Sequence, residues 1–88
     1  MIDIYTTSEC PKCVKVASFF DENKIAFKKK VMDQDPEDET DALMLNIISA
    51  PAIVYKGMVL REKSMFKAGK VDGAAIMNFL KVAEKVGK

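Results

Sequence analysis

The apolar and polar positions at the start of the chain fit a short strand followed by an amphipathic helix. Residues 2–6 are rich in β-branched and aromatic side chains, which predicts a strand. Residues 7–9 are polar and predict a loop, after which Pro11 suits the first turn of a helix that extends to about residue 23. Apolar side chains at three- and four-residue spacing give this helix a buried face, namely Cys13, Val16, Phe19 and Phe20.

The next segment, residues 25–32, predicts a strand that carries lysines. Its positions alternate, with Ile25, Phe27 and Val31 on one side, where Lys29 interrupts the apolar pattern, and Lys28 and Lys30 on the other. A central parallel strand is apolar on both faces, whereas lysines discourage pairing at an open edge. We therefore expect an edge strand. The run of lysines also fits a nucleic-acid contact, which we disfavour because no aromatic platform accompanies it.

Six acidic residues within positions 33–41 mark the start of a second helix that ends near residue 46. Asp35 suits the N-cap, and the proline and acids that follow suit the first turn, where the helix dipole favours negative charge. We expect Leu43 and Ile47 to face inward. A metal site is the alternative, but the spacing does not fit a calcium loop.

An apolar run after Pro51 predicts the centre of the sheet. The X-Pro step ends the preceding helical stretch, and residues 52–55 are continuously apolar, as in a strand buried on both faces. Lys56-Gly57 predicts a tight turn into an antiparallel partner over residues 58–61.

The last third of the chain predicts a loop over residues 62–70 and then a helix capped by Asp72. The buried stripe of that helix consists of Ile76, Phe79, Leu80 and Ala83. The element order is therefore β-α-β-α-β-β-α, an α/β arrangement in which residues 1–88 form a single domain.

Composition and charge narrow the classes of function. The 88 residues are 49% apolar and 31% charged. The net charge is +1, so the overall charge does not favour binding to nucleic acid or to a membrane. Residues 1–41 carry six lysines and ten acids, and residues 42–88 carry eight basic residues and three acids, so the charge is unevenly spread. No apolar run is long enough to span a bilayer, and the chain opens without the features of a secretory signal. We expect a monomeric, cytoplasmic protein.

Two cysteines and the lack of histidine restrict the chemistry. Without histidine, every His-dependent mechanism and every Cys/His zinc site is excluded. Small secreted proteins held by disulfides usually carry more cysteines at wider spacing. Cys10 and Cys13 instead lie three residues apart at the start of a helix, close enough to form a small disulfide.

The surroundings of the two sulfurs predict different roles. Cys10 lies where free backbone N–H groups and the helix dipole stabilise a thiolate, whereas Cys13 lies one turn further on the apolar side. We expect Cys10 to attack a substrate disulfide and Cys13 to resolve the mixed disulfide. A CxxC pair also binds metals, but this pair follows a strand, opens a helix and contains Pro11, and an X-Pro step precedes an apolar strand about forty residues later.

Several segments resemble glutaredoxins and glutaredoxin-like redoxins: residues 4–6, residues 10–15, Phe19-Phe20, and residues 48–54 around Pro51, which resemble the family's cis-proline segment. The resemblance implies the thioredoxin fold, with a four-stranded mixed sheet in order 2-1-3-4 and helices on both faces. It also implies that Cys10 and Cys13 are catalytic, that Pro51 is cis, and that a substrate contacts Pro11, Lys12, Ala50 and Pro51.

The chain departs from glutaredoxins at positions that contact glutathione. Thr7 stands where those proteins usually carry lysine, Lys12 where they carry tyrosine, and residues 61–66 where they carry a Gly-Gly pair; Asp72 still fits an acid or cap of the glutathione site. The chain thus resembles intermediate redoxins, which are thioredoxin-like in function and some of which donate electrons to ribonucleotide reductase. We expect protein disulfides as substrates, a thioredoxin-reductase-like or other reductase as partner, and neither glutathione, a cofactor nor a metal at the site.

Two alternatives remain. One is a glutathione-dependent glutaredoxin, against which the missing lysine and glycines count. The other is a soft-metal module such as a copper chaperone, which follows β-α-β-β-α-β and gives Pro51 no role.

The loop after the last strand is expected to border the active site. Met65 and Phe66 either contact substrate within a lysine-ringed docking rim or fold back as a lid on the last helix.

Overall fold

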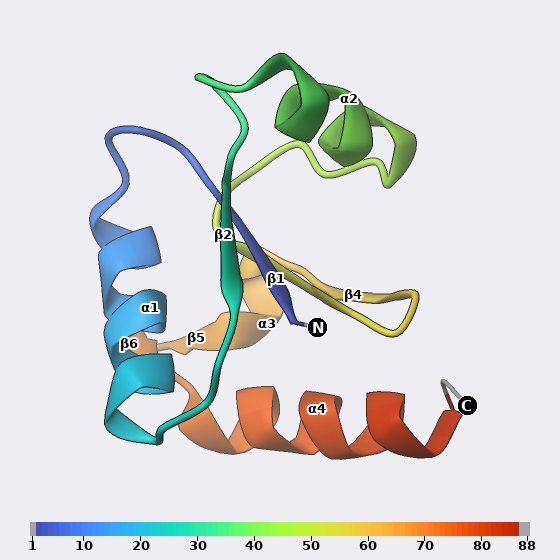
Figure 1. Ribbon diagram of the computed structural model, residues 1–88. Helices are drawn as coiled ribbons and strands as arrows, with labels where there is room; N and C mark the ends of the chain where they lie inside the picture. Colours follow the sequence, from blue (N-terminus) through green and yellow to red (C-terminus); the bar gives the residue numbers. More distant parts are fainter. Residues whose placement is uncertain (1, 87–88) are drawn as a thin grey trace.

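A four-stranded mixed sheet organises the computed structural model, which describes residues 2–86 (Figure 1). Its strands are β1 (Asp3–Thr6), β2 (Lys28–Val31), β3 (Ala52–Tyr55) and β4 (Met58–Leu60). The order is β2-β1-β3-β4, with β2 parallel to β1 and the β1–β3 and β3–β4 pairs antiparallel. The predicted α/β class and strand order are confirmed.

Helices cover both faces of this sheet (Figure 1). The helices are α1 (Pro11–Glu22), α2 (Pro36–Met44), α3 (Glu62–Met65) and α4 (Gly73–Val86). Two capping predictions are confirmed, since Asp35 accepts a hydrogen bond from Glu37 N (2.9 Å) and Asp72 accepts one from Ala75 N (3.1 Å). No helix within residues 2–86 is long and apolar enough to cross a membrane.

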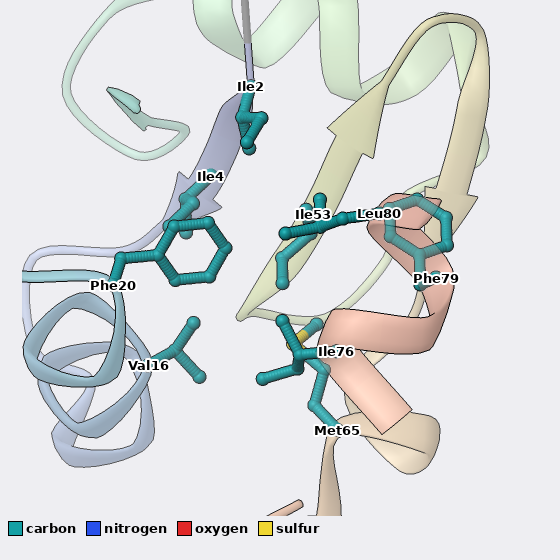
Figure 2. Packing of buried hydrophobic residues seen from close by; sticks show 9 residues of the cluster. All are labelled: Ile2, Ile4, Val16, Phe20, Ile53, Met65, Ile76, Phe79 and Leu80. Carbon is teal, nitrogen blue, oxygen red and sulfur yellow. The ribbon is translucent and has the colours of Figure 1, made fainter. Parts of the chain in front are cut away.

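The larger core lies between the sheet and helices α1 and α4 (Figure 2). Val16 and Phe20 of α1 are fully buried and face Ile76 of α4, with Ile4 and Ile53 supplied by the sheet. Burying an aliphatic or aromatic side chain of this size stabilises a fold by roughly 1.5–3 kcal/mol. The burial of these side chains confirms the predicted inward faces of α1 and α4.

The smaller core lies on the other face of the sheet, under α2. Tyr5 and Ala52 of the sheet pack there against Ala42 and Ile47. Leu43 is 66% exposed, so its predicted inward orientation is wrong, whereas that of Ile47 is confirmed. The reason is local: α2 places the small Ala42 against the sheet, and Leu43 is turned about 100° away from it, toward solvent.

The edge position of β2 is confirmed, but Lys30 is not a solvated edge lysine. Its ammonium lies 3.1 Å from Asp41 Oδ2 and 5.3 Å from the centre of the Tyr5 ring, and its side chain is 14% exposed. Burial disfavours the charged form, yet the hydrogen bonds to Asp41 and Tyr5 outweigh it and raise the pKa of Lys30. Lys30 thereby joins α2 to the sheet.

The segment predicted as a loop is partly regular, so that prediction is wrong. Residues 62–65 form the one-turn helix α3, and the next residues form a hairpin of β5 (Phe66–Lys67) and β6 (Lys70–Val71). The hairpin turn places Ala68 (φ 53°) and Gly69 (φ 78°) in the left-handed region. Alanine is a poor signal for such a turn, which explains why the sequence pattern did not indicate it.

Candidate functional site

Cys10 and Cys13 lie at the N-terminal end of α1 and form a disulfide, with their Cα atoms 5.2 Å apart. Cys10 is the N-cap of α1, and its sulfur accepts a hydrogen bond from Cys13 N at 3.1 Å. Cys10 is half-buried and Cys13 is 4% exposed. The outer sulfur is thus at the positive end of the helix, where a thiolate is stabilised, and the inner sulfur is shielded.

The Ala50-Pro51 segment borders the same end of the sheet. Tyr5, next to the end of β1, pairs with Ala52, the first residue of β3. The loop that leaves β1 toward Cys10 and the loop that enters β3 through Pro51 therefore lie at one sheet end. The Ala50-Pro51 bond is cis, which confirms that prediction, and Pro51 is buried.

Lys12, between the two cysteines, is held by two residues that follow β4. Its Nζ lies 2.6 Å from Glu62 Oε1 and 5.5 Å from the centre of the Phe66 ring. The side chain of Glu62 is 24% exposed, so the pair is partly shielded from solvent. The expectation that the segment after β4 borders the CPKC motif, residues 10–13, is confirmed by these contacts.

The loop in front of Cys10 is anchored by Asp33, at the turn after β2. Asp33 accepts hydrogen bonds from the backbone N of Ser8 (3.0 and 3.2 Å) and from its hydroxyl (2.6 Å). These bonds favour the carboxylate and lower the pKa of Asp33. The sequence analysis missed this pair because the two residues are 25 positions apart and only the β1–β2 register brings them together.

Arg61 anchors the other loop of the site and was also missed. Its guanidinium donates to Asn46 O (2.8 Å) and Leu45 O (3.2 Å), the carbonyls that follow α2. A cation at a helix C-terminus is stabilised by the dipole as well as by the hydrogen bonds. Arg61 thus ties the end of β4 to the segment that leads into Pro51, a contact for which the sequence carries no local signal.

Met65 does not lie on the surface, so its predicted place on a docking rim is wrong. Its side chain is fully buried in the larger core, where Figure 2 shows it beside Ile76. Phe66 is half-buried, packs partly on the same core and lies under Lys12. Asp72 caps α4 through Ala75 N, and its contact with a substrate stays a prediction. Of the two interpretations of this segment, the one in which it folds back on the last helix therefore holds for Met65.

One groove is lined by the motif, and a second lies at the neighbouring loops. The first, of about 300 Å³, lies between α1 and β2, and both cysteines line it together with Thr7, Ser8, Val14 and Lys29. The other, of about 320 Å³, lies beside the Pro51 loop, and Ile48, Ser49, Glu62 and Lys63 are among its lining residues. Within residues 2–86, no group of three or more Cys, Asp and Glu side chains is placed to hold a metal ion.

This geometry defines a thioredoxin-fold protein with a cysteine pair at a helix N-terminus and a cis-proline loop at the same end of the sheet. The chain belongs to the glutaredoxin family, whose model matches residues 2–60. Family and cysteine pair together support a thiol–disulfide oxidoreductase as the class of activity. The family match ends with β4, so α3, the β5–β6 hairpin and α4 lie beyond it.

Solved structures agree with this fold. The crystal structure of the thioredoxin-like protein BC3987 has a TM-score of 0.70 and 24% identity, over 94% of this chain and 99% of that one. A point variant of that protein gives a TM-score of 0.66 and 27% identity, over 69% of this chain and 84% of that one. A comparison with curated proteins finds no match.

Proposed function

We propose that this protein reduces protein disulfides through the Cys10–Cys13 dithiol. The observation that carries the proposal is the asymmetry of the pair: Cys10 is the half-buried N-cap of α1, whereas Cys13 is fully buried one turn further. The Cys10 thiolate attacks one sulfur of the target disulfide and releases the other as a thiolate, which takes up a proton. Cys13 then loses its proton and attacks Cys10 in the mixed disulfide. The target leaves with two thiols, and the protein keeps the disulfide.

The proposed electron source is a reductase of the thioredoxin-reductase type, or another protein reductase, rather than glutathione. Thr7 supplies no cation for a glutathione carboxylate, and the cation of Lys12 is engaged by Glu62 at 2.6 Å. Losing a charge-assisted hydrogen bond of roughly 1.5–3 kcal/mol weakens binding by about an order of magnitude or more. We include ribonucleotide reductase among the proposed targets, and a reducing compartment such as the cytoplasm as the place of action.

The test of the electron source is reduction of insulin disulfides by the protein with three electron donors in parallel. The donors are NADPH with thioredoxin reductase, NADPH with glutathione and glutathione reductase, and dithiothreitol as the control. We expect turnover with thioredoxin reductase and dithiothreitol, and little with glutathione. Efficient glutathione-coupled turnover would instead favour the glutathione-dependent alternative, and no turnover with dithiothreitol would refute the proposal.

The roles of the two cysteines are tested separately by trapping. Cys13→Ser should accumulate a mixed disulfide with the target, because the resolving thiol is missing. Cys10→Ser should accumulate none and lose turnover. Limiting iodoacetamide near neutral pH should label Cys10 of the reduced wild type first, and preferential labelling of Cys13 would reverse the assignment.

A further inference from the structure

A group of exposed lysines borders the site on α3 and on the β5–β6 hairpin. Lys63 lies in α3, and Lys67 and Lys70 flank the two-residue turn of the hairpin. We call Lys63, Lys67 and Lys70 the lysine surface. The hairpin lies beside α1, the helix that carries the cysteines, and β6 contacts that helix (Figure 1).

The contacts of Lys12 show how near the lysine surface is to the CPKC motif. Lys12 touches Glu62 and lies over the ring of Phe66. Lys63 follows the first of these residues directly in the chain, and Lys67 follows the second. The lysine surface therefore begins next to the motif, on the flank formed by α3 and β5.

The charge of the lysine surface is not neutralised within the fold. Among the basic side chains of residues 2–86, only Lys12 and Lys30 form ion pairs. The acids that flank the surface have other partners, because Glu62 holds Lys12 and Asp72 caps α4. The positive charge remains available to a molecule that approaches Cys10.

The hairpin also places two like charges side by side. Lys67 and Lys70 are direct cross-strand partners, and like charges in that relation destabilise a sheet. Between them Ala68 adopts φ 53°, a conformation that costs a residue with a side chain free energy. Neither feature helps the hairpin to fold, so the stability of the fold does not account for the presence of Lys67 opposite Lys70.

We propose that the lysine surface docks an acidic segment next to the disulfide of the protein substrate. The inference rests on the proposed function and names the partner chemistry of the same site. Carboxylates close to a target disulfide are drawn to the lysine surface, which orients that disulfide toward Cys10 and acts mainly on the association rate. A nucleic acid fits less well, because Phe66 is half-buried under Lys12 and is not free to stack on a base.

The test uses three disulfide-cyclised peptides with the same ring, flanked by runs of Glu, of Lys, or of Gly and Ser. In each reaction the protein dithiol is oxidised to the Cys10–Cys13 disulfide, and the peptide disulfide takes up two electrons and two protons. At low salt, the wild type should reduce the Glu peptide about tenfold faster than the Lys peptide. This rate ratio should approach one near 1 M salt, where the Debye length is about 3 Å.

The variant Lys67→Glu with Lys70→Glu should reverse the preference. The two new side chains still repel each other across the hairpin, so the change in fold stability is small while the sign of the surface is inverted. Lys81→Glu with Lys85→Glu, at exposed positions of α4, makes the same change in net charge and is the matched control. It should keep the wild-type preference for the Glu peptide.

Each result decides the inference. An unchanged rate ratio in the hairpin variant, or an equal change in the α4 control, overturns the docking site while the proposed function stands. Inhibition by a single-stranded oligonucleotide that far exceeds inhibition by a poly-Glu peptide of the same charge, and that is lost in the hairpin variant, assigns the lysine surface to nucleic acid and also overturns it. Failure to reduce any of the three peptides, where dithiothreitol does so, overturns the proposed function and the docking site together.

Discussion

The ammonium of Lys12 and the carboxylate of Glu62 lie 2.6 Å apart, although the two residues are 50 positions apart in the chain. The contact joins the CPKC motif to the first residue of α3 and places a carboxylate beside the cation of Lys12, which lies between the two cysteines in the sequence. A positive charge close to Cys10 stabilises its thiolate and hence the reduced form of the pair.

Glu62→Gln is therefore expected to make the protein more oxidising. A partly exposed ion pair is worth about 0.2–1 kcal/mol, which corresponds to roughly 5–20 mV for a two-electron couple. The potential is measured by equilibrating the protein with dithiothreitol buffers and counting free thiols by alkylation. In a Lys12→Met background the same substitution should change nothing, and an equal shift in both backgrounds would show that Glu62 acts by another route.

Acid should loosen the loop before Cys10, because the Ser8 hydrogen bonds hold the pKa of Asp33 below its usual value of about 3.9. A carboxyl group with a lowered pKa in the folded state stabilises the fold above its unfolded pKa, and this contribution is lost as pH falls through the folded pKa. Asp33→Asn should therefore show a shallower fall of the melting temperature between about pH 5 and 3. Glu22→Gln, at an exposed position of α1, is the control, and an equal effect there would contradict the assignment.

Met65→Ala should strongly destabilise the protein, since the side chain is fully buried. Truncating a buried methionine to alanine costs about 2–5 kcal/mol, measured as the change in the free energy of unfolding by urea. Met44→Ala removes the same side chain from a position that is 79% exposed and should stay within about 0.5 kcal/mol of the wild type. Similar small effects at both positions would mean that Met65 is not part of the core.

Arg61→Met should impair substrate binding more than the chemical step. It removes the donors that hold the carbonyls of Leu45 and Asn46, so the segment leading to Pro51 loses its tie to β4. We expect KM for insulin to rise several-fold with kcat little changed, together with a loss of about 0.5–1.5 kcal/mol in stability. Arg61→Lys keeps the charge without the forked donors, so its KM should lie between those of the wild type and Arg61→Met. A fall in kcat alone would argue against a positioning role.

Local patterns in the sequence determined the cysteine pair and the order of the elements other than α3, β5 and β6. The helix caps at Asp35 and Asp72, the buried stripe of α4 and the edge position of β2 all follow from spacing and residue type, and the structure confirms them. Such features depend on neighbours within one or two turns of a helix or on the faces of one strand. That is why they can be predicted without knowledge of the tertiary structure.

Tertiary structure alone decided the contacts that set the conformation of the site. The examples are Lys12 with Glu62, Ser8 with Asp33, and Arg61 with the backbone carbonyls that follow α2. Each contact joins polar groups of exposed or partly exposed residues far apart in sequence. Such residues follow no periodic pattern in the sequence that would indicate their partners. Only the sheet register and the packing of α2 and α3 bring them together. The burial of Met65 has the same origin: a single methionine in a one-turn helix carries no periodicity, and the docking of α3 against α4 placed it in the core.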